Sequence, residues 1–236
     1  MNPITVQAFL FDMDGTLIDS IAVVDRVLRD FSAKYGLDPD EVSARAHGRP
    51  LIDNMIHYLG DNELARKEAE LFTQIELSTL DGVVALPGAA ELLGILPDAA
   101  WALVTSAGRD LALRRMQAVG LPLPSTLITA DDVQQGKPHP QPYLLAAQKL
   151  GVPIENCLVL EDAPAGIQAG LASGAKVLVV NDHADVEGLA VHGVCRLNEV
   201  EVVVGNGGFE VRRVKQRNLK YRNASFCFLA KHSSKS

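Results

Sequence analysis

The sequence predicts an α/β fold in which a parallel β-sheet lies between two layers of helices, with a helical insertion after the first strand. Two observations support this. Short apolar runs of strand length alternate with segments of helical periodicity, a pattern typical of strand–helix–strand units. Residues 18–84 break this alternation, because they contain helical patterns without a clear strand signal.

Five apolar runs have the length of buried strands. They are residues 6–11, 100–104, 126–129, 157–160 and 176–180. Runs that are mostly apolar and alternate with helical segments are typical of parallel strands covered by helices on both faces. We therefore expect these segments to form one parallel sheet.

Segments with helical spacing of apolar residues lie between the later strands. They cover residues 89–96, 111–119, 143–150 and 167–171. Each is followed by a residue that commonly ends helices, at Pro97, Gly120, Gly151 and Gly174. The spacing and the punctuation together predict helices that cover both faces of the sheet.

Residues 18–84 contain two apolar faces with helical spacing. The first consists of Ile21, Val24, Val27, Leu28 and Phe31, and the second of Leu64, Leu71, Phe72 and Ile75. An insertion at this place would cover the carboxyl edge of the sheet, where open α/β folds bind ligands. We interpret it as a cap that excludes water and selects substrates, with a helical subdomain without a catalytic role as the alternative.

The C-terminal part differs in composition from the rest. Residues 200–204 and 209–214 flank Gly205-Asn206-Gly207-Gly208, which predicts a hairpin. Residues 215–236 are basic and contain no acidic residue. We interpret them as a disordered tail or a frameshift remnant, with a basic arm for an acidic partner as the alternative. The expected organisation is a core of residues 1–17 and 85–204, a cap of residues 18–84, and a hairpin and tail of residues 205–236.

Composition narrows the class of protein. The chain has 236 residues, 47% of them apolar, which is enough for a sizeable core. A net charge of −7 and an aromatic content of 5% argue against nucleic-acid binding. Cys157, Cys195 and Cys227 show no metal-ligand spacing and fit a reducing compartment. With no signal peptide and no membrane span in the sequence, we expect a cytoplasmic protein.

Asp12 and Asp14 follow the first apolar run directly, and Gly15 follows them. In an extended segment, residues two apart point to the same side, so both carboxylates would reach one place. Two like charges so close are unfavourable unless a cation or a shared proton relieves them. The pair therefore predicts a metal site, an acid/base pair, or both.

Polar residues also follow two other predicted strands. Thr105-Ser106 comes after residues 100–104, and Glu161-Asp162 comes after residues 157–160. Lys137 lies between them, at the expected start of a helix. This set suits phosphoryl transfer, in which cations and donors must hold a negatively charged group. A divalent ion between Asp12 and Asp162 would cancel the repulsion from the carboxylates, and Mg²⁺ prefers such oxygen ligands.

These residues resemble, in order and spacing, the four motifs of the haloacid dehalogenase-like hydrolase superfamily. The matching motifs are Asp12-Met13-Asp14-Gly15-Thr16, Thr105, Lys137 and Glu161-Asp162, within a resemblance that covers roughly residues 4–200. The insertion resembles the small helical cap of the β-phosphoglucomutase-like subgroup, and residues 136–143 and 161–166 look most like bacterial sugar phosphatases. The resemblance implies a Rossmann-like core with strand order 5-4-1-2-3.

The resemblance also implies roles for the acidic residues. Asp12 would be the nucleophile that forms an aspartyl-phosphate. Asp14 would be the general acid that protonates the leaving alcohol, and then the base that activates water. Asp12, the backbone carbonyl of Asp14, and Asp162 would bind Mg²⁺, with Glu161 in support.

Further residues would bind the substrate. Thr105, the backbone amide of Ser106, and Lys137 would hold the phosphoryl oxygens, and Gly15 would leave room for the phosphate. In the cap, His47 and Arg49 lie where the subgroup often places substrate-contacting residues. Each residue alone also has a simpler interpretation. Thr105 could cap a helix N-terminus, and Lys137 could be an ordinary surface lysine.

The resemblance favours a Mg²⁺-dependent phosphatase that hydrolyses small phosphorylated sugars or polyols and binds neither nucleic acid nor membrane. Enzymes of this subgroup are often monomers, so we expect a monomer. A phosphomutase is the first alternative, but mutases of this subgroup carry a cap histidine at the position of Val24 and tend to lack Thr16. The second alternative is a receiver domain or a binding protein without turnover. Receivers, however, are shorter and lack the insertion. Dehalogenases of the superfamily lack the second aspartate of the first motif, so the presence of Asp14 in this chain argues against a dehalogenase.

Overall fold

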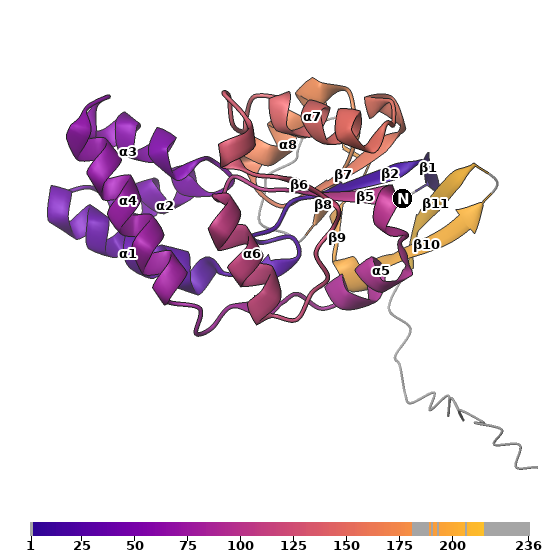
Figure 1. Ribbon diagram of the computed structural model, residues 1–236, viewed down its shortest axis with the longest axis horizontal. Helices are drawn as coiled ribbons and strands as arrows, with labels where there is room; N and C mark the ends of the chain where they lie inside the picture. Colours follow the sequence, from indigo (N-terminus) through magenta and orange to yellow (C-terminus); the bar gives the residue numbers. More distant parts are fainter. Residues whose placement is uncertain (1, 181–188, 190, 193, 206, 215–236) are drawn as a thin grey trace, which may run out of the picture.

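A parallel β-sheet forms the centre of the larger part of the molecule (Figure 1). The structure, a computed structural model, describes residues 2–180, 189, 191–192, 194–205 and 207–214. Within them the sheet contains, in spatial order, β6 (Thr126–Ile128), β5 (Trp101–Val104), β2 (Ala8–Phe11), β7 (Cys157–Glu161), β8 (Lys176–Val180) and β9 (Val194–Cys195). All neighbouring strands run parallel. From β8 to β6 the strands follow the expected order 5-4-1-2-3, and β9 adds a short sixth strand.

Helices cover both faces of the sheet, as expected from the sequence. α7 (Gln141–Leu150) and α8 (Pro164–Ser173) lie on one face, and α5 (Ala89–Ile95) and α6 (Arg109–Ala118) on the other (Figure 1). Successive residues of a strand point to opposite faces. Leu10 therefore packs with α7 and α8, whereas Phe9 and Phe11 pack with α5 and α6.

Short 3-10 helices complete the connections. They are η1 (Asp98–Ala100), η2 (Ala130–Asp132), η3 (Ile154–Asn156) and η4 (Leu197–Glu199). None of the described helices combines the length and the apolar character needed to cross a membrane.

The first predicted strand, residues 6–11, is divided in two, which corrects the prediction. Gln7 is exposed, and its backbone N–H donates to the carbonyl of Asn156 at 2.7 Å. The chain bends there, so that only β2 enters the central sheet, while β1 (Ile4–Val6) leaves it. The break is hard to predict, because Gln7 is the single polar residue of the run and the residues on either side of it are apolar and buried.

The predicted C-terminal hairpin is confirmed. β10 (Val200–Gly205) pairs antiparallel with β11 (Gly208–Arg213), and β11 also pairs antiparallel with β1. Val211 and Phe209 join the main apolar core. The basic segment of residues 215–236, with Cys227, lies outside the described residues.

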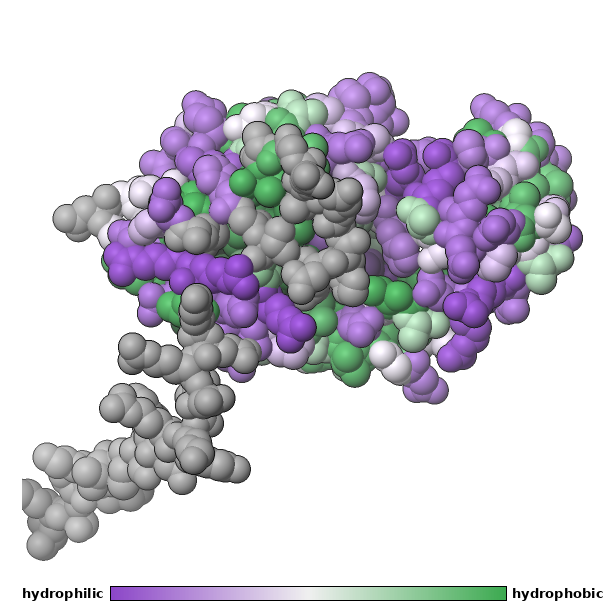
Figure 2. Space-filling view, turned by 180° about the vertical axis from the view of Figure 1, so that it is seen from behind, coloured by the Kyte–Doolittle hydropathy of each residue, from purple (hydrophilic) through white to green (hydrophobic). Residues whose placement is uncertain are grey.

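Four helices form a separate cluster, called the cap below. They are α1 (Ile21–Tyr35), α2 (Pro39–Ala46), α3 (Leu51–Leu59) and α4 (Glu63–Ser78). The cap has its own apolar centre, which includes Phe31, Met55 and Phe72. In Figure 2 it forms a lobe of its own, and most of the visible surface of that lobe is hydrophilic. β3 (Ile18–Asp19) pairs with β4 (Val84–Ala85), so the two connections between cap and core run side by side.

We expect the hairpin to stabilise the core through Phe209, which is 7% exposed and lies against Phe9 with ring centroids 5.3 Å apart. Phe209→Ala should lower the free energy of unfolding by about 3 kcal/mol, as for other buried aromatic side chains. Val204→Ala is the control, because Val204 lies opposite Phe209 in β10 and is 73% exposed. It should cost less than about 1 kcal/mol in urea denaturation. Equal losses for the two variants would contradict a shared core.

Candidate active site

The carboxyl ends of three neighbouring strands bring the predicted site residues together. Asp12 follows β2, Thr105 follows β5, and Glu161 ends β7. The backbone N–H of Asp12 donates to the carbonyl of Leu160 at 3.0 Å, and that of Thr105 to the carbonyl of Ile128 at 2.9 Å. The ladder therefore continues one residue beyond the strands and fixes the backbone of both side chains.

Lys137 places its ammonium group at the centre of the carboxyl edge of the sheet. It lies in the loop before α7 rather than at a helix start, and it is 1% exposed. Its Nζ donates to Asp12 Oδ1 at 2.5 Å, to Glu161 Oε1 at 2.7 Å and to the carbonyl of Val104 at 3.0 Å. An ammonium has three donors, so all of them are used. Burial disfavours the charged form, but Asp12 and Glu161 outweigh it and raise the pKa of Lys137 above its usual range.

The carboxylate of Glu161 is held in place by hydrogen bonds from four donors. Its Oε1 accepts from Lys137 and from the hydroxyl of Tyr143 at 3.0 Å, and its Oε2 accepts from the backbone N–H groups of Asp162 at 2.9 Å and Ala163 at 3.0 Å. Four donors occupy the usual acceptor positions of a carboxylate. This pattern fits the supporting role that was expected for Glu161.

Tyr143 was not predicted as a site residue. Its place in a helical pattern assigned it to the core, and it is indeed fully buried in α7. Burial and the nearby carboxylate of Glu161 raise the pKa of Tyr143, so its hydroxyl keeps the proton that it donates. The spacing of Tyr143 carried no signal for this contact.

Asp12, Glu161 and Asp162 form a cluster that could hold a metal ion. One carboxylate oxygen of each lies within 4.8 Å of those of the other two, and all three residues are buried, although each oxygen of Glu161 already accepts two hydrogen bonds. Burial and Glu161 raise the pKa of Asp12 and of Asp162, although Lys137 acts in the opposite direction. Three carboxylates thus share one ammonium, and a bound cation would relieve the excess negative charge. Oxygen ligands of this kind suit Mg²⁺, so the donor set fits the expected ion.

Gly15 and Thr16 hold Asp162 at the cluster. The hydroxyl of Thr16 donates to Asp162 Oδ1 at 3.0 Å. Gly15 has φ of +85°, and a Cβ there would lie 2.0 Å from Asp162 Oδ2. Any side chain at Gly15 would therefore displace the carboxylate of Asp162.

Asp14 has different partners from Asp12. Because β2 ends at Phe11, the two-residue alternation of a strand does not extend to Asp14. Its Oδ1 accepts from the hydroxyl of Ser20 at 2.6 Å and from Nη1 of Arg115 at 2.9 Å. Arg115 and its second partner, Glu76, were not predicted, because their contact depends on how the cap packs on the core.

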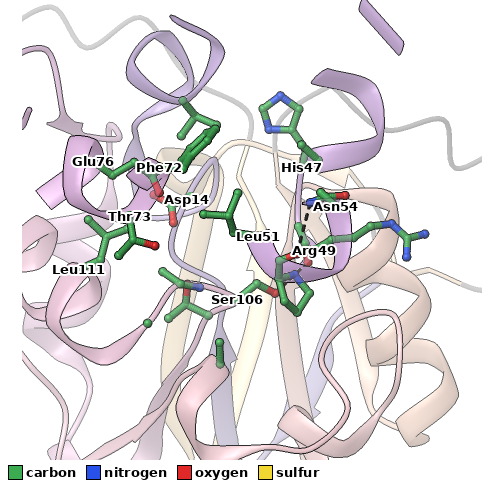
Figure 3. A pocket seen from close by; sticks show the side chains of 18 of the residues that line it. Asp14, His47, Arg49, Leu51, Asn54, Phe72, Thr73, Glu76, Ser106 and Leu111 are labelled. Atoms are coloured by element: carbon green, nitrogen blue, oxygen red, sulfur yellow. Dashed lines mark hydrogen bonds between the residues drawn. The ribbon is translucent and has the colours of Figure 1, made fainter. Parts of the chain in front are cut away.

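A cavity of about 350 Å³ lies between the cap and the carboxyl edge of the sheet. Core residues that line it include Asp12, Asp14, Thr105, Ser106 and Asp162. Cap residues that line it include His47, Arg49, Leu51, Asn54, Phe72, Thr73 and Glu76 (Figure 3). The hydroxyl of Ser106 donates to the carbonyl of Gly48 at 2.9 Å, which ties the rim of the cap to the core.

The structure thus brings only some of the predicted residues into direct contact. Asp12, Lys137, Glu161 and Asp162 form one hydrogen-bonded or clustered set. The hydroxyl of Thr105 accepts from the backbone N–H of Ala107 at 3.1 Å, at the cavity wall. His47 and Arg49 lie on the cap side, where the guanidinium of Arg49 points away from Asp14 in Figure 3.

Comparison with known proteins identifies the family. The family model of the haloacid dehalogenase-like hydrolases matches residues 6–174. The chain belongs to this family. Among solved structures, a β-phosphoglucomutase from Clostridium difficile has the same fold, with a TM-score of 0.71 and 22% sequence identity, over 83% of this chain and 93% of that protein.

Two curated haloacid dehalogenase-like relatives are similar over most of their length. Hexitol phosphatase A of Escherichia coli is 43% identical over 203 residues, which cover 84% of this chain and 90% of that protein. Glycerol-1-phosphate phosphohydrolase 2 of Saccharomyces cerevisiae is 34% identical over 223 residues, which cover 89% of each chain. The similarity therefore includes both the core and the cap.

Gly15→Ala should remove the stabilisation of the protein by Mg²⁺, because the new Cβ displaces Asp162. Gly174→Ala is the matched control: its φ is +88°, but nothing lies within 4 Å of an added Cβ. Both variants should lose about 1 kcal/mol from the strained backbone. Only wild type and Gly174→Ala should show a higher melting temperature when MgCl₂ is added. An equal response of Gly15→Ala to Mg²⁺ would contradict this description of the metal site.

Proposed function

We propose that this protein is a Mg²⁺-dependent phosphatase that hydrolyses small phosphorylated sugars or polyols through an aspartyl-phosphate on Asp12. The observation that carries the proposal is the position of Asp12, which lines the cavity while Lys137 holds one of its oxygens at 2.5 Å. Lys137 thereby leaves Asp12 a second oxygen with which to attack. The names of hexitol phosphatase A and glycerol-1-phosphate phosphohydrolase 2 support a polyol phosphate as the substrate.

The residues of the site suit two successive displacements at phosphorus. In the first, an oxygen of Asp12 forms a bond to phosphorus, the bond to the leaving oxygen breaks, and Asp14 gives that oxygen a proton. In the second, Asp14 takes a proton from water as the water oxygen bonds to phosphorus. The bond between phosphorus and Asp12 then breaks, and inorganic phosphate leaves.

The remaining predicted residues would hold the phosphoryl group. Thr105 and the amide of Ser106 would donate to its oxygens, and Lys137 would add positive charge. Asp12, the backbone carbonyl of Asp14, and Asp162 would hold Mg²⁺, which when bound would neutralise phosphoryl oxygens.

The cavity supports a compact polar leaving group. Its volume of about 350 Å³ lies at the lower end of the range for small-molecule sites. Polar side chains of the cap, including His47, Arg49 and Asn54, alternate with the apolar Leu51 and Phe72. A leaving group with hydroxyls along a carbon chain matches this mixed lining. We propose that residues 18–84 act as the cap that selects it, in a monomeric, cytoplasmic enzyme that binds no nucleic acid.

A phosphomutase is the alternative within this fold. A mutase of the subgroup would carry a histidine at position 24, where this chain has a valine that lines the cavity. Thr16, which the mutases tend to lack, bonds to Asp162 here. Both features favour water as the acceptor. A protein that only accepts phosphate, the other alternative, would release no more than one equivalent.

Asp12→Asn should abolish phosphate release from p-nitrophenyl phosphate, because the neutral amide is a poor nucleophile. We expect at least about a 10³-fold loss, in line with the removal of a covalent nucleophile. Wild type should release many equivalents with Mg²⁺ and none with EDTA. Asp53→Asn, a cap carboxylate outside the site cavity, is the control and should keep wild-type rates. Full activity in EDTA, or in Asp12→Asn, would refute the proposal.

Asp14→Asn should slow both displacements and let the phosphoenzyme accumulate. Quenching in acid with a ³²P-labelled substrate would measure the protein-bound phosphate. We expect a larger bound fraction in Asp14→Asn than in wild type, since hydrolysis of the aspartyl-phosphate also needs the base. No bound phosphate in either protein would count against a covalent intermediate.

A panel of phosphorylated metabolites, compared by kcat/KM, should rank linear polyol phosphates above nucleotides. The cavity of about 350 Å³ and its mixed lining give the reason. A preference for nucleoside monophosphates would contradict the assignment of the leaving group.

A further inference from the structure

Arg115 is a buried arginine at the junction of the core and the cap. It lies on α6 and is only 2% exposed. A buried guanidinium is unfavourable unless carboxylates pair with it. Two carboxylates do: Nη1 donates to Asp14 Oδ1 at 2.9 Å, and Nη2 donates to Glu76 Oε1 at 2.6 Å. Arg115 therefore connects the expected general acid with α4 of the cap.

The contacts of Arg115 are concentrated on these two acids. Burial disfavours its charge, but Asp14 and Glu76 outweigh it and raise the pKa of Arg115, so the guanidinium stays charged. Its Nε is buried and has no hydrogen-bond partner in the described part of the chain. A buried donor without a partner is unfavourable. The orientation that lets Nη1 and Nη2 reach the two acids therefore carries the cost of an unsatisfied Nε–H.

The same contacts restrict the carboxylate of Asp14. Arg115 and Ser20 both donate to one oxygen, Oδ1. Two donors on one oxygen, Ser20 before α1 and Arg115 on α6, restrict the rotation of the carboxylate. Neither of them donates to Oδ2, the oxygen that would exchange a proton with the leaving group. Glu76 is 6% exposed and in turn fixes the second arm of the guanidinium. In Figure 3, Glu76 and Asp14 lie on the same side of the cavity.

We propose that Arg115 is a positioning residue that aims Asp14 at the leaving oxygen, and that Glu76 of the cap is required for it to do so. This inference rests on the proposed phosphatase function. It assigns to α4 a part in proton transfer, although no residue of α4 reacts. Proton donation in this enzyme then depends on the seating of the cap.

The dependence on leaving-group basicity tests the proposal. Phenyl phosphate and p-nitrophenyl phosphate are close in size, but phenolate is much the stronger base and gains more from a proton donor. The value of kcat/KM covers the steps up to the aspartyl-phosphate and thus reports on donation to the leaving group. Arg115→Met should lower kcat/KM for phenyl phosphate about tenfold more than for p-nitrophenyl phosphate, which is part of the roughly 10²–10⁴-fold that a well-placed proton donor contributes.

Three further variants keep the test decisive. Arg115→Lys retains the charge but has a single ammonium in place of a two-armed fork, and it should show the same selective loss. Glu76→Gln should show a smaller selective loss. Arg114→Met is the control, because Arg114 is the neighbouring, exposed arginine of α6 and donates to the carbonyl of Leu77 in α4 at 3.5 Å rather than to Asp14 or Glu76. It removes a contact between core and cap without touching the carboxylates, so it should leave the ratio unchanged. If Arg115→Met does not fold, the ratios of Arg115→Lys and Glu76→Gln decide.

The outcomes separate this inference from the proposed function. A wild-type protein that hydrolyses no phosphate ester would overturn both. A wild-type phosphatase whose Arg115 and Glu76 variants lose activity equally on the two aryl phosphates would overturn only this inference, and would assign Arg115 a purely structural role.

Discussion

The hydrogen bonds of the buried Lys137 ammonium are the interactions on which the rest of the site depends. It joins three strand ends, through Asp12 after β2, the carbonyl of Val104 in β5, and Glu161 at the end of β7. Removing one partner from a buried ion pair costs about 3–5 kcal/mol, because the other charge stays behind without compensation. The network therefore fixes Asp12 more firmly than surface charges could. Glu161 also fixes the backbone of Asp162 and Ala163, because it accepts hydrogen bonds from their N–H groups.

The cap contributes to the site through polar contacts as well as through shape. Ser106 of the core donates to the carbonyl of Gly48, and Arg115 of the core pairs with Glu76. A Cβ on Gly48 would lie 2.6 Å from Cβ of Ala163, so the rim of the cap approaches the core closely. These contacts hold cap side chains such as His47 and Phe72 at the cavity that Asp12 and Asp162 also line.

Much of this could be predicted from the sequence, because the informative signals are local. Mostly apolar runs indicated the central strands, and Gly151 and Gly174 indicated where α7 and α8 end. Non-local contacts gave no such signal. β1 pairs with β11, some two hundred residues away, and the bend at Gln7 depends on Asn156. The contacts of Tyr143 and Arg115 likewise depend on how separate elements pack, and helical periodicity alone assigned neither residue to the site.

The central claim is that the carboxylate of Asp12 takes the phosphoryl group. Reduction with borohydride most directly locates an acyl-phosphate, because it converts the phosphorylated aspartate to homoserine, which mass spectrometry assigns to one residue. Asp14→Asn that has been mixed with substrate and Mg²⁺ and then quenched should yield homoserine at position 12. Reduction at another carboxylate, or at none while the enzyme turns over, would contradict the account.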